Sequence, residues 1–151
     1  MSFLSTLNIA GSGMTAQQTR LDVIAENIAN ANTTRTEAGG AYRRKVVTMQ
    51  AQDGRNDFRA AMARAQRVSN AGYTTTAGVK ITNIAEDDSD LKLVYDPTHP
   101  DANEDGYVEL PNVDMVQEMT DAMAASQAFN ANVTVFNTIK GVIARGLDIG
   151  R

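Results

Sequence analysis

The chain opens with the stretch FLSTLNIAGSGMTAQQTRLDVIAENIANA at residues 3–31. Its larger apolar residues recur at spacings of three, four and seven, and they are Leu4, Leu7, Met14, Leu21, Ile24 and Ile28. This spacing predicts an amphipathic helix with a narrow apolar stripe. The other side carries uncharged Thr, Gln and Ser, which neighbours can cover without desolvating charges. We therefore expect a helix that interacts along much of its length.

Two glycines fall in the first half of this helix. Gly11 and Gly13 each lower helix stability by roughly 1 kcal/mol relative to alanine, so the first dozen residues are expected to fray in a monomer. No strand precedes Gly11-Ser12-Gly13, and no lysine follows at the spacing of a phosphate-binding loop. The pair is interpreted as helix-breaking or as a site of close packing.

A second, stronger pattern runs from Asn112 to about Arg145. Its apolar residues step by three and four, and they include Met115, Met119, Phe129, Val133, Phe136, Ile143 and Leu147. Asn112 or Asp114 is available to cap the first turn. About 34 residues at about 1.5 Å each give a helix of roughly 50 Å, far above the mean globular length. Such a helix needs a partner, and heptad-like spacing in both helices predicts that they pair as a coiled coil.

The middle of the chain has strand character. Four segments are rich in β-branched or aromatic residues or alternate in polarity, and they are residues 42–49, 79–84, 91–95 and 107–108. The acidic cluster 86–89 is typical of a hairpin turn between two of these strands. Residues 53–77 are ambiguous, because their pattern suits a flexible loop or a helix that forms only with a partner.

The predicted fold class is α+β, with long N- and C-terminal helices that pair as a coiled coil and a small mainly-β module inserted between them. The predicted parts are an N-terminal helix at 1–33, the β module at 34–110 with its flexible 53–77 loop, and a C-terminal helix at 111–151. The two terminal parts are expected to pack together as one unit.

The composition excludes much chemistry. The 151 residues include eight aromatic side chains, no cysteine and one histidine, His99. Disulfides, thiolate zinc sites and cysteine nucleophiles are thus excluded, and histidine-based catalysis lacks partners. A net charge of −4 and a pI near 4.9 speak against nucleic-acid binding. No apolar run approaches the roughly 18 residues of a membrane span, and the N-terminus lacks the pattern of a cleavable signal. We predict no catalytic residue, no cofactor and no metal.

One motif suggests calcium. The first half of an EF-hand loop is matched by Asp101, Asn103, Asp105 and Gly106. The twelfth position of such a loop is a bidentate glutamate, but here it is Asn112, directly after a proline. An acidic turn is therefore favoured over a calcium site. His99, which stands between two prolines, is interpreted as a turn residue.

Charge is segregated along the chain. Between Arg35 and Arg67 there are eight Lys or Arg against three acids, whereas between Glu86 and Glu109 there are nine acids and one lysine. Two interpretations remain open. In the first, the charged segments are solvated loop faces. In the second, a basic patch on one copy meets an acidic patch on another copy, and this contact fixes how the two copies are oriented.

Three blocks of the sequence resemble a known family. Residues 13–34, GMTAQQTRLDVIAENIANANTT, resemble the N-terminal signature of the rod and hook family of bacterial flagellar axial proteins. Similarity to the proximal-rod members of that family continues through GGAYRRK (39–45), YDPTHPDANEDGYV (95–108), PNVD (111–114), ANVTVFNT (131–138) and LDIGR (147–151). Residues 57–76 depart from the pattern.

The resemblance implies a non-enzymatic subunit of the basal-body rod, a helical tube in the periplasm that carries torque from rotor to hook and forms part of the export channel. It implies export by the flagellar type III apparatus without a cleaved signal peptide. The implied partners are further copies of the chain, other proximal-rod and distal-rod proteins, the rotor-ring adaptor and the export apparatus. Neither nucleic acid nor direct membrane insertion is expected. The alternatives are a soluble coiled-coil adaptor and a calcium-binding module.

A joint that carries torque must not slide. Apolar burial is non-directional, whereas asparagine side chains form hydrogen bonds only in register. Subunit packing is therefore assigned to Leu4, Leu7, Met14, Leu21, Ile24, Ile28, Met115, Met119, Phe129, Val133, Phe136, Ile143 and Leu147. Registry between subunits is assigned to Asn27, Asn30, Asn32, Asn130, Asn132 and Asn137. For Asn30 and Asn32, at the helix end, simple capping is the alternative.

Overall fold

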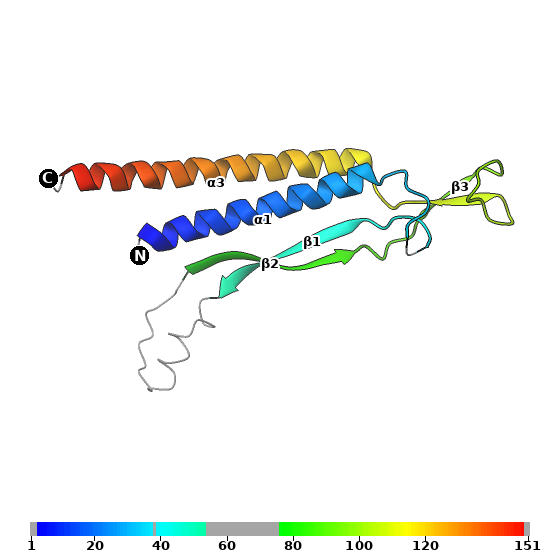
Figure 1. The fold of residues 1–151 in the computed structure, drawn as a ribbon, viewed down its shortest axis with the longest axis horizontal. Helices are drawn as coiled ribbons and strands as arrows, with labels where there is room; N and C mark the ends of the chain where they lie inside the picture. Colours follow the sequence, from blue (N-terminus) through cyan, green and yellow to red (C-terminus); the bar gives the residue numbers. More distant parts are fainter. Residues whose placement is uncertain (1–2, 38, 54–75, 150–151) are drawn as a thin grey trace, which may run out of the picture. The chain divides into compact units, whose positions relative to one another are not determined.

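The computed structural model describes residues 3–37, 39–53 and 76–149. In chain order its elements are α1 (Phe3–Ala29), β1 (Lys45–Asp53), β2 (Thr76–Glu86), β3 (Lys92–Tyr95), β4 (Tyr107–Leu110) and α3 (Met115–Ile149) (Figure 1). The predicted α+β class is confirmed. The division into 1–33, 34–110 and 111–151 stays a prediction, and residues 54–75 of the predicted loop lie outside the described residues. Neither described helix is long and apolar enough to cross a membrane.

Helix α1 runs without a break through both of its glycines, so the helix-breaking interpretation of the pair is wrong. Gly13 allows close packing instead: a Cβ atom placed there would lie 3.0 Å from the Asn132 side-chain nitrogen of α3. Gly11 has open space around it. A single glycine therefore lets the two helices approach each other at this point.

Helix α3 begins three residues later than predicted, because its cap is Asp114. The Asp114 carboxylate accepts hydrogen bonds from the backbone N–H groups of Val116 (2.9 Å) and Gln117 (3.3 Å), which satisfies two donors of the first turn. The other predicted cap, Asn112, points its side chain to different partners. It accepts from the Arg44 backbone N–H (2.8 Å) and donates to the Ser89 hydroxyl (2.8 Å).

The strands form two separate two-stranded sheets, one of β1 and β2 and one of β3 and β4. In the second sheet the strands are antiparallel, with Lys92 opposite Leu110 and Tyr95 opposite Tyr107. The predicted hairpin turn at 86–89 is wrong, because β2 and β3, which it joins, lie in different sheets. The Asp87 carboxylate does accept a hydrogen bond from the Ser89 backbone N–H (3.0 Å), so the local turn forms without pairing the strands.

The chain forms two compact units, each made from separate segments. The terminal unit consists of Met1–Gln17, Met49–Thr82 and Ala128–Arg151, and the central unit consists of Gln18–Thr48 and Asn83–Gln127. The buried apolar residues of the central unit are Val23, Ile24, Tyr42, Val108, Val113 and Ala125, and those of the terminal unit are Ala10 and Ala16. The buried apolar residues described in the terminal unit are both alanines, whereas those of the central unit are mainly valine and isoleucine with one tyrosine.

In the terminal unit, strand β2 lies directly against α1. The Ser12 hydroxyl accepts a hydrogen bond from the Val79 backbone N–H (3.0 Å) and donates to the Ile9 carbonyl (2.8 Å). Gly78 has φ +89°, and a Cβ atom there would fall 2.1 Å from the Ser12 hydroxyl oxygen. Only glycine combines this backbone conformation with so close an approach.

Candidate assembly surface

The central unit encloses two polar side chains, Asn27 of α1 and Glu118 of α3, which are 1% and 0% exposed. The Asn27 amide nitrogen donates to the Glu118 carboxylate (3.2 Å) and to the Lys45 carbonyl (2.9 Å). Its amide oxygen accepts from the Tyr42 hydroxyl (2.9 Å) and from the Lys45 backbone N–H (2.9 Å). One side chain therefore joins α1, the start of β1 and α3, with all its hydrogen-bonding capacity used.

Arg44 supplies the cation that the buried Glu118 carboxylate needs. Its Nε donates to Glu118 at 2.7 Å, and its guanidinium lies 3.7 Å from the Asp87 carboxylate and 3.8 Å from that of Asp121. Arg20 of α1 donates to Asp121 at 2.9 Å. A buried carboxylate without a counter-charge is strongly destabilising, so Arg44 is required for the two helices to pack here.

The Tyr42 hydroxyl stays protonated over a wide pH range. Burial, followed by the nearby carboxylates of Glu26, Glu118 and Glu86, raises its pKa to about 12. The neutral hydroxyl can therefore donate to Asn27 at every physiological pH. Asp87, at the edge of the network, has its pKa lowered chiefly by the hydrogen bonds from Ser89 and then by Arg44.

The raised pKa of Tyr42 predicts a loss of stability in alkali. The unfolded tyrosine, with a pKa near 10, loses its proton before the folded one does, so the stabilisation is complete below pH 10 and declines as pH rises towards 12. We expect the free energy of unfolding to fall by on the order of 2 kcal/mol across this window through Tyr42 alone. Urea unfolding at pH 8, 10 and 11.5 measures it. Tyr42→Phe is expected to start less stable and to show a shallower alkaline decline; equal slopes would contradict the assignment.

Helix α3 also presents exposed apolar side chains. Val116, Met119 and Met123 are spaced by three and four residues and are 75%, 53% and 60% exposed, while Val135 and Val142, seven residues apart, are about half exposed. We call Val116, Met119 and Met123, which lie within about 60° of one another around the helix, the outer face of α3. Val135 and Val142 lie on another side of the helix at about 100° per residue. Between Asp121 and Lys140 the helix has no charged residue. Clustered exposed apolar side chains mark a surface that another protein covers.

The packing residues predicted from sequence divide by exposure. Ile24 is buried and Leu4, Met119 and Leu147 are exposed, whereas the half-buried ones are Leu7, Met14, Leu21, Ile28, Met115, Phe129, Val133, Phe136 and Ile143. The predicted stripes therefore mostly face the chain's own interior. Three exposed apolar residues of α3 were missed, namely Val116, Val135 and Val142. Their signal was a second apolar spacing on α3, which the stronger first one masked.

The asparagines predicted to set registry also differ in environment. Asn27 bonds within the chain as described above, and Asn30 donates to the Glu26 carbonyl (3.0 Å) and accepts from Thr33 (3.1 Å), which is a helix-end arrangement. Asn132 is half-buried beside Gly13. The exposed ones are Asn32, Asn130 and Asn137. Registry between subunits stays a prediction for these residues.

The residues of the calcium-like motif are used within a turn. The Asn103 side-chain oxygen accepts from the backbone N–H groups of Asp105 (3.1 Å) and Tyr107 (2.9 Å), and the Asp101 carboxylate accepts from the Thr34 hydroxyl (2.8 Å). His99 Nδ1 accepts from the Asp101 backbone N–H (3.1 Å), so His99 acts as a turn residue. In the described part of the chain, no three His, Asp or Glu side chains are grouped to hold a metal ion.

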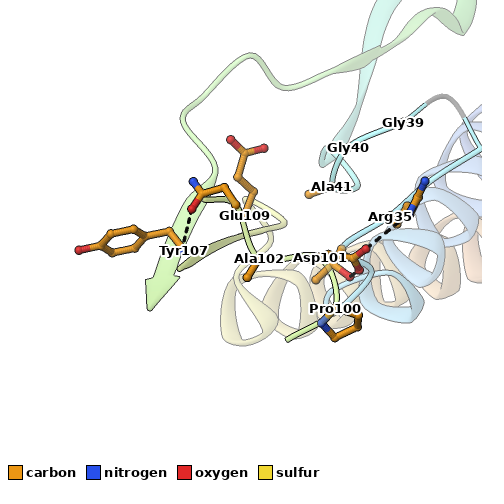
Figure 2. Close-up of a pocket in the computed structure, with 11 residues that line it drawn as sticks. Arg35, Gly39, Gly40, Ala41, Pro100, Asp101, Ala102, Tyr107 and Glu109 are labelled. Carbon is orange, nitrogen blue, oxygen red and sulfur yellow. Dashed lines mark hydrogen bonds and ion pairs between the residues drawn. The ribbon is translucent and has the colours of Figure 1, made fainter. Parts of the chain in front are cut away.

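A cavity of about 410 Å³ lies beside this turn in the central unit. Its walls come from residues 34–35, 39–41, 100–103, 107 and 109. Figure 2 shows Arg35 and Asp101, an ion pair of 3.8 Å, at one side. Gly39 and Gly40, with φ of +87° and +81°, have no atom near the position of a Cβ. These lining residues contain no arrangement of nucleophile and base.

The sequence is similar to known proteins over its whole length. Residues 7–35 match a family described as flagella basal body rod protein, and residues 104–149 match the C-terminal family of the flagellar basal body rod proteins FlgEFG. The flagellar basal-body rod protein FlgC of Bacillus subtilis is 42% identical over the full length of both chains. The FlgC proteins of Borreliella burgdorferi and Escherichia coli O157:H7 are 40% and 39% identical, over 98% or more of each chain.

Proposed function

Since the chain belongs to the family of flagellar basal-body rod proteins FlgC, we propose that it assembles in the proximal rod as part of a helical tube. Membership of the family makes it a structural subunit of the flagellar basal body and not an enzyme. In this proposal the tube transmits torque from rotor to hook and encloses part of the export channel. The adaptor and calcium-module alternatives are not favoured.

The outer face of α3 is the observation that carries this proposal. A monomer in water gains nothing from exposing Val116 at 75% and Met123 at 60%, whereas neighbours in a tube would cover both. Methionine side chains also suit contacts with non-identical rod proteins, because methionine adapts to irregular surfaces. Leu4 and Leu147, exposed near the two ends of the chain, would be covered in the same way.

The two long helices are proposed to pair as a coiled coil in the assembled rod. Two contacts within the chain support pairing: the close approach of Gly13 and Asn132, and the ion pair of Arg20 with Asp121. The half-buried stripe residues, such as Leu21 and Phe129, would complete the seam. The buried network around Glu118 would then hold the β1 strand against this pair.

The proposed partners are further copies of this chain, the other proximal-rod and distal-rod proteins, the rotor-ring adaptor and the flagellar type III export apparatus. The proposed location is the periplasmic rod, reached without a cleaved signal peptide. The absence of cysteine is compatible with a chain that travels unfolded and refolds outside the cytosol. Neither nucleic acid nor direct membrane insertion enters the proposal.

Deletion of the gene tests the function. We expect cells without the chain to be non-motile, with basal bodies that lack the rod in electron micrographs of the envelope, and we expect the plasmid-borne gene to restore both. Intact rods in the deletion strain would refute the proposed function. A soluble adaptor would instead yield a stable small oligomer of the purified chain and leave the rod in place.

The registry role is tested on Asn132 and Asn137, which do not end a helix. We expect the double replacement by alanine to reduce swimming under viscous load more than in dilute medium, because slippage grows with torque while apolar packing is retained. Tethered-cell rotation and rod counts in micrographs measure the effect. Normal motility and normal rods in the double variant would overturn the registry assignment and leave the packing assignment standing.

A further inference from the structure

The β3–β4 hairpin has one face that the central unit leaves uncovered. The register pairs Leu93 with Glu109 and Tyr95 with Tyr107, so these four side chains share a face. Leu93 is 63%, Tyr95 64% and Tyr107 43% exposed, whereas Val108, on the opposite face, is 3% exposed. We call Leu93, Tyr95, Tyr107 and Glu109 the tyrosine face. It combines two aromatic rings, an aliphatic side chain and a carboxylate.

The two rings are exposed and yet held in place. They meet edge to face, with centroids 5.2 Å apart and planes at 66°. Gly106 has φ +80°, and a Cβ atom there would lie 2.9 Å from the Tyr95 ring, so this ring rests on the bare backbone of the turn. In Figure 2 the Tyr107 ring points away from the Arg35–Asp101 pair. Rings positioned before binding lose little freedom on binding and act as anchors in interfaces.

The surroundings of the tyrosine face are strongly negative. The segment from Glu86 to Glu109 holds nine acids and one lysine. Of these acids, Glu109 lies on the face itself, and Glu104 and Asp105 lie in the connection between the strands. Across the described residues no cation lies within ion-pair distance of these three carboxylates. A partner must therefore bring positive charge as well as surface that packs against aromatic rings.

Arginine is the side chain that meets both needs. Its planar guanidinium stacks on an aromatic ring and forms two parallel hydrogen bonds with a carboxylate. A lysine ammonium attracts a carboxylate as a point charge but cannot form that paired, planar contact. Several arginines of the chain are already engaged within it, among them Arg20 and Arg44. Four more arginines are clustered in residues 54–68, GRNDFRAAMARAQRV. This stretch lies outside the described residues, so it is considered by its sequence alone.

We infer that the tyrosine face of one copy binds the arginine-rich stretch 54–68 of a second copy. This inference rests on the proposed function, because rod assembly is what brings copies side by side. The two opposite charges reside on one chain, so each copy offers a face and a complementary stretch, which is a head-to-tail contact that can propagate along a helical assembly. The sequence of the stretch also contains the apolar residues Phe58 and Met62.

A binding experiment with the full chain tests the chemistry without requiring rods. The probe is a fluorescein-labelled peptide of residues 54–68, followed by anisotropy. We expect saturable binding that weakens with salt and that drops about tenfold for Tyr95→Ser or Glu109→Gln, as for an interface anchor. Asp90→Asn, which removes an acid outside the strands, is the matched control and is expected to bind normally. A peptide with lysine at all four arginine positions is expected to bind more weakly.

The opposite results would overturn the inference. Absence of saturable binding would do so, and so would equal weakening by Asp90→Asn and by the tyrosine-face variants, because that pattern means unspecific attraction of charge. Circular dichroism of each variant checks that it is folded. Tyr107→Ser provides a second test of the face, should Tyr95→Ser prove unfolded.

Cross-linking in cells separates this inference from the proposed function. The chain has no cysteine, so Glu109→Cys and Arg59→Cys expressed on separate copies can form a disulfide only between copies. We expect a disulfide-linked dimer in isolated basal bodies. Intact rods without that dimer would overturn the inference and leave the function standing. A link found only when both cysteines are on one chain would show that the face binds its own chain, which also overturns it.

Discussion

Glu118→Ala is expected to destabilise the protein by about 3–5 kcal/mol, the usual cost of breaking a buried ion pair by removing one partner. The Arg44 guanidinium would lose its shortest contact, at 2.7 Å, and the Asn27 amide would lose one acceptor. Two carboxylates at 3.7 and 3.8 Å would remain near Arg44, which places the effect towards the lower end. For a chain of this size the melting temperature should fall by roughly 6–12 °C. Thermal unfolding followed by circular dichroism measures this.

Two further variants establish the cause of that loss. Glu118→Gln keeps a hydrogen-bonding side chain of the same size and removes the charge, so it should retain part of the stability. Replacing Glu118 and Arg44 together by methionine removes both charges and should cost less than Glu118→Ala alone. Glu104→Ala, an exposed position in a turn, serves as the control and should change the melting temperature little. A stable Glu118→Ala protein would show that the network contributes little to folding.

Met123→Glu on the outer face of α3 is expected to abolish swimming while leaving the isolated chain folded. Met123 is 60% exposed in the monomer, so a glutamate there stays hydrated and should alter stability by less than about 0.5 kcal/mol. In an assembled rod the same carboxylate would be buried without a cation, at a cost of several kcal/mol. Swimming in soft agar and rod counts in electron micrographs measure assembly, and thermal unfolding of the purified variant measures the chain itself.

The matched control for this variant is Met123→Leu, which preserves the apolar surface and should swim normally. Val135→Glu repeats the test further along the helix and should give the same loss. Normal rods in both glutamate variants would show that these exposed apolar residues of α3 stay in water after assembly. A variant that unfolds in isolation would instead show that the side chain belongs to the fold, in contradiction to its exposure.

The helices were predictable because their signal is local. The α1 spacing placed its start at Phe3 and its end within two residues of Ala29, and the α3 spacing identified the long second helix. The turn at 86–89 was recognised locally as well, but the pairing of its strands was predicted wrongly, because a turn motif carries no information on which strand lies alongside. Likewise Asn112 has a side chain that can cap a helix. The tertiary structure instead places it in hydrogen bonds with Arg44 and Ser89, so it links those two segments.

The candidate surface was predicted less well than the fold. Sequence spacing identified the apolar stripes of both helices, yet it could not say which stripe faces the chain's own interior and which faces solvent. Leu21 and Phe129 are half-buried in the monomer, whereas Val135, absent from the predicted set, is exposed. A helix with apolar residues on two sides can bury either side against its own chain. The packing of segments distant in sequence decides which side is buried.

By itself the sequence determined that this chain has two long helices around short strands, no thiol chemistry and a family resemblance strong enough to indicate a rod subunit. Periodicity and composition are properties of neighbouring residues, so they can be read without a structure. Only the tertiary structure decided the role of Asn27, whose partners Tyr42, Lys45 and Glu118 stand up to 91 positions away along the chain. A buried amide is defined by what surrounds it in space, and no local pattern records that.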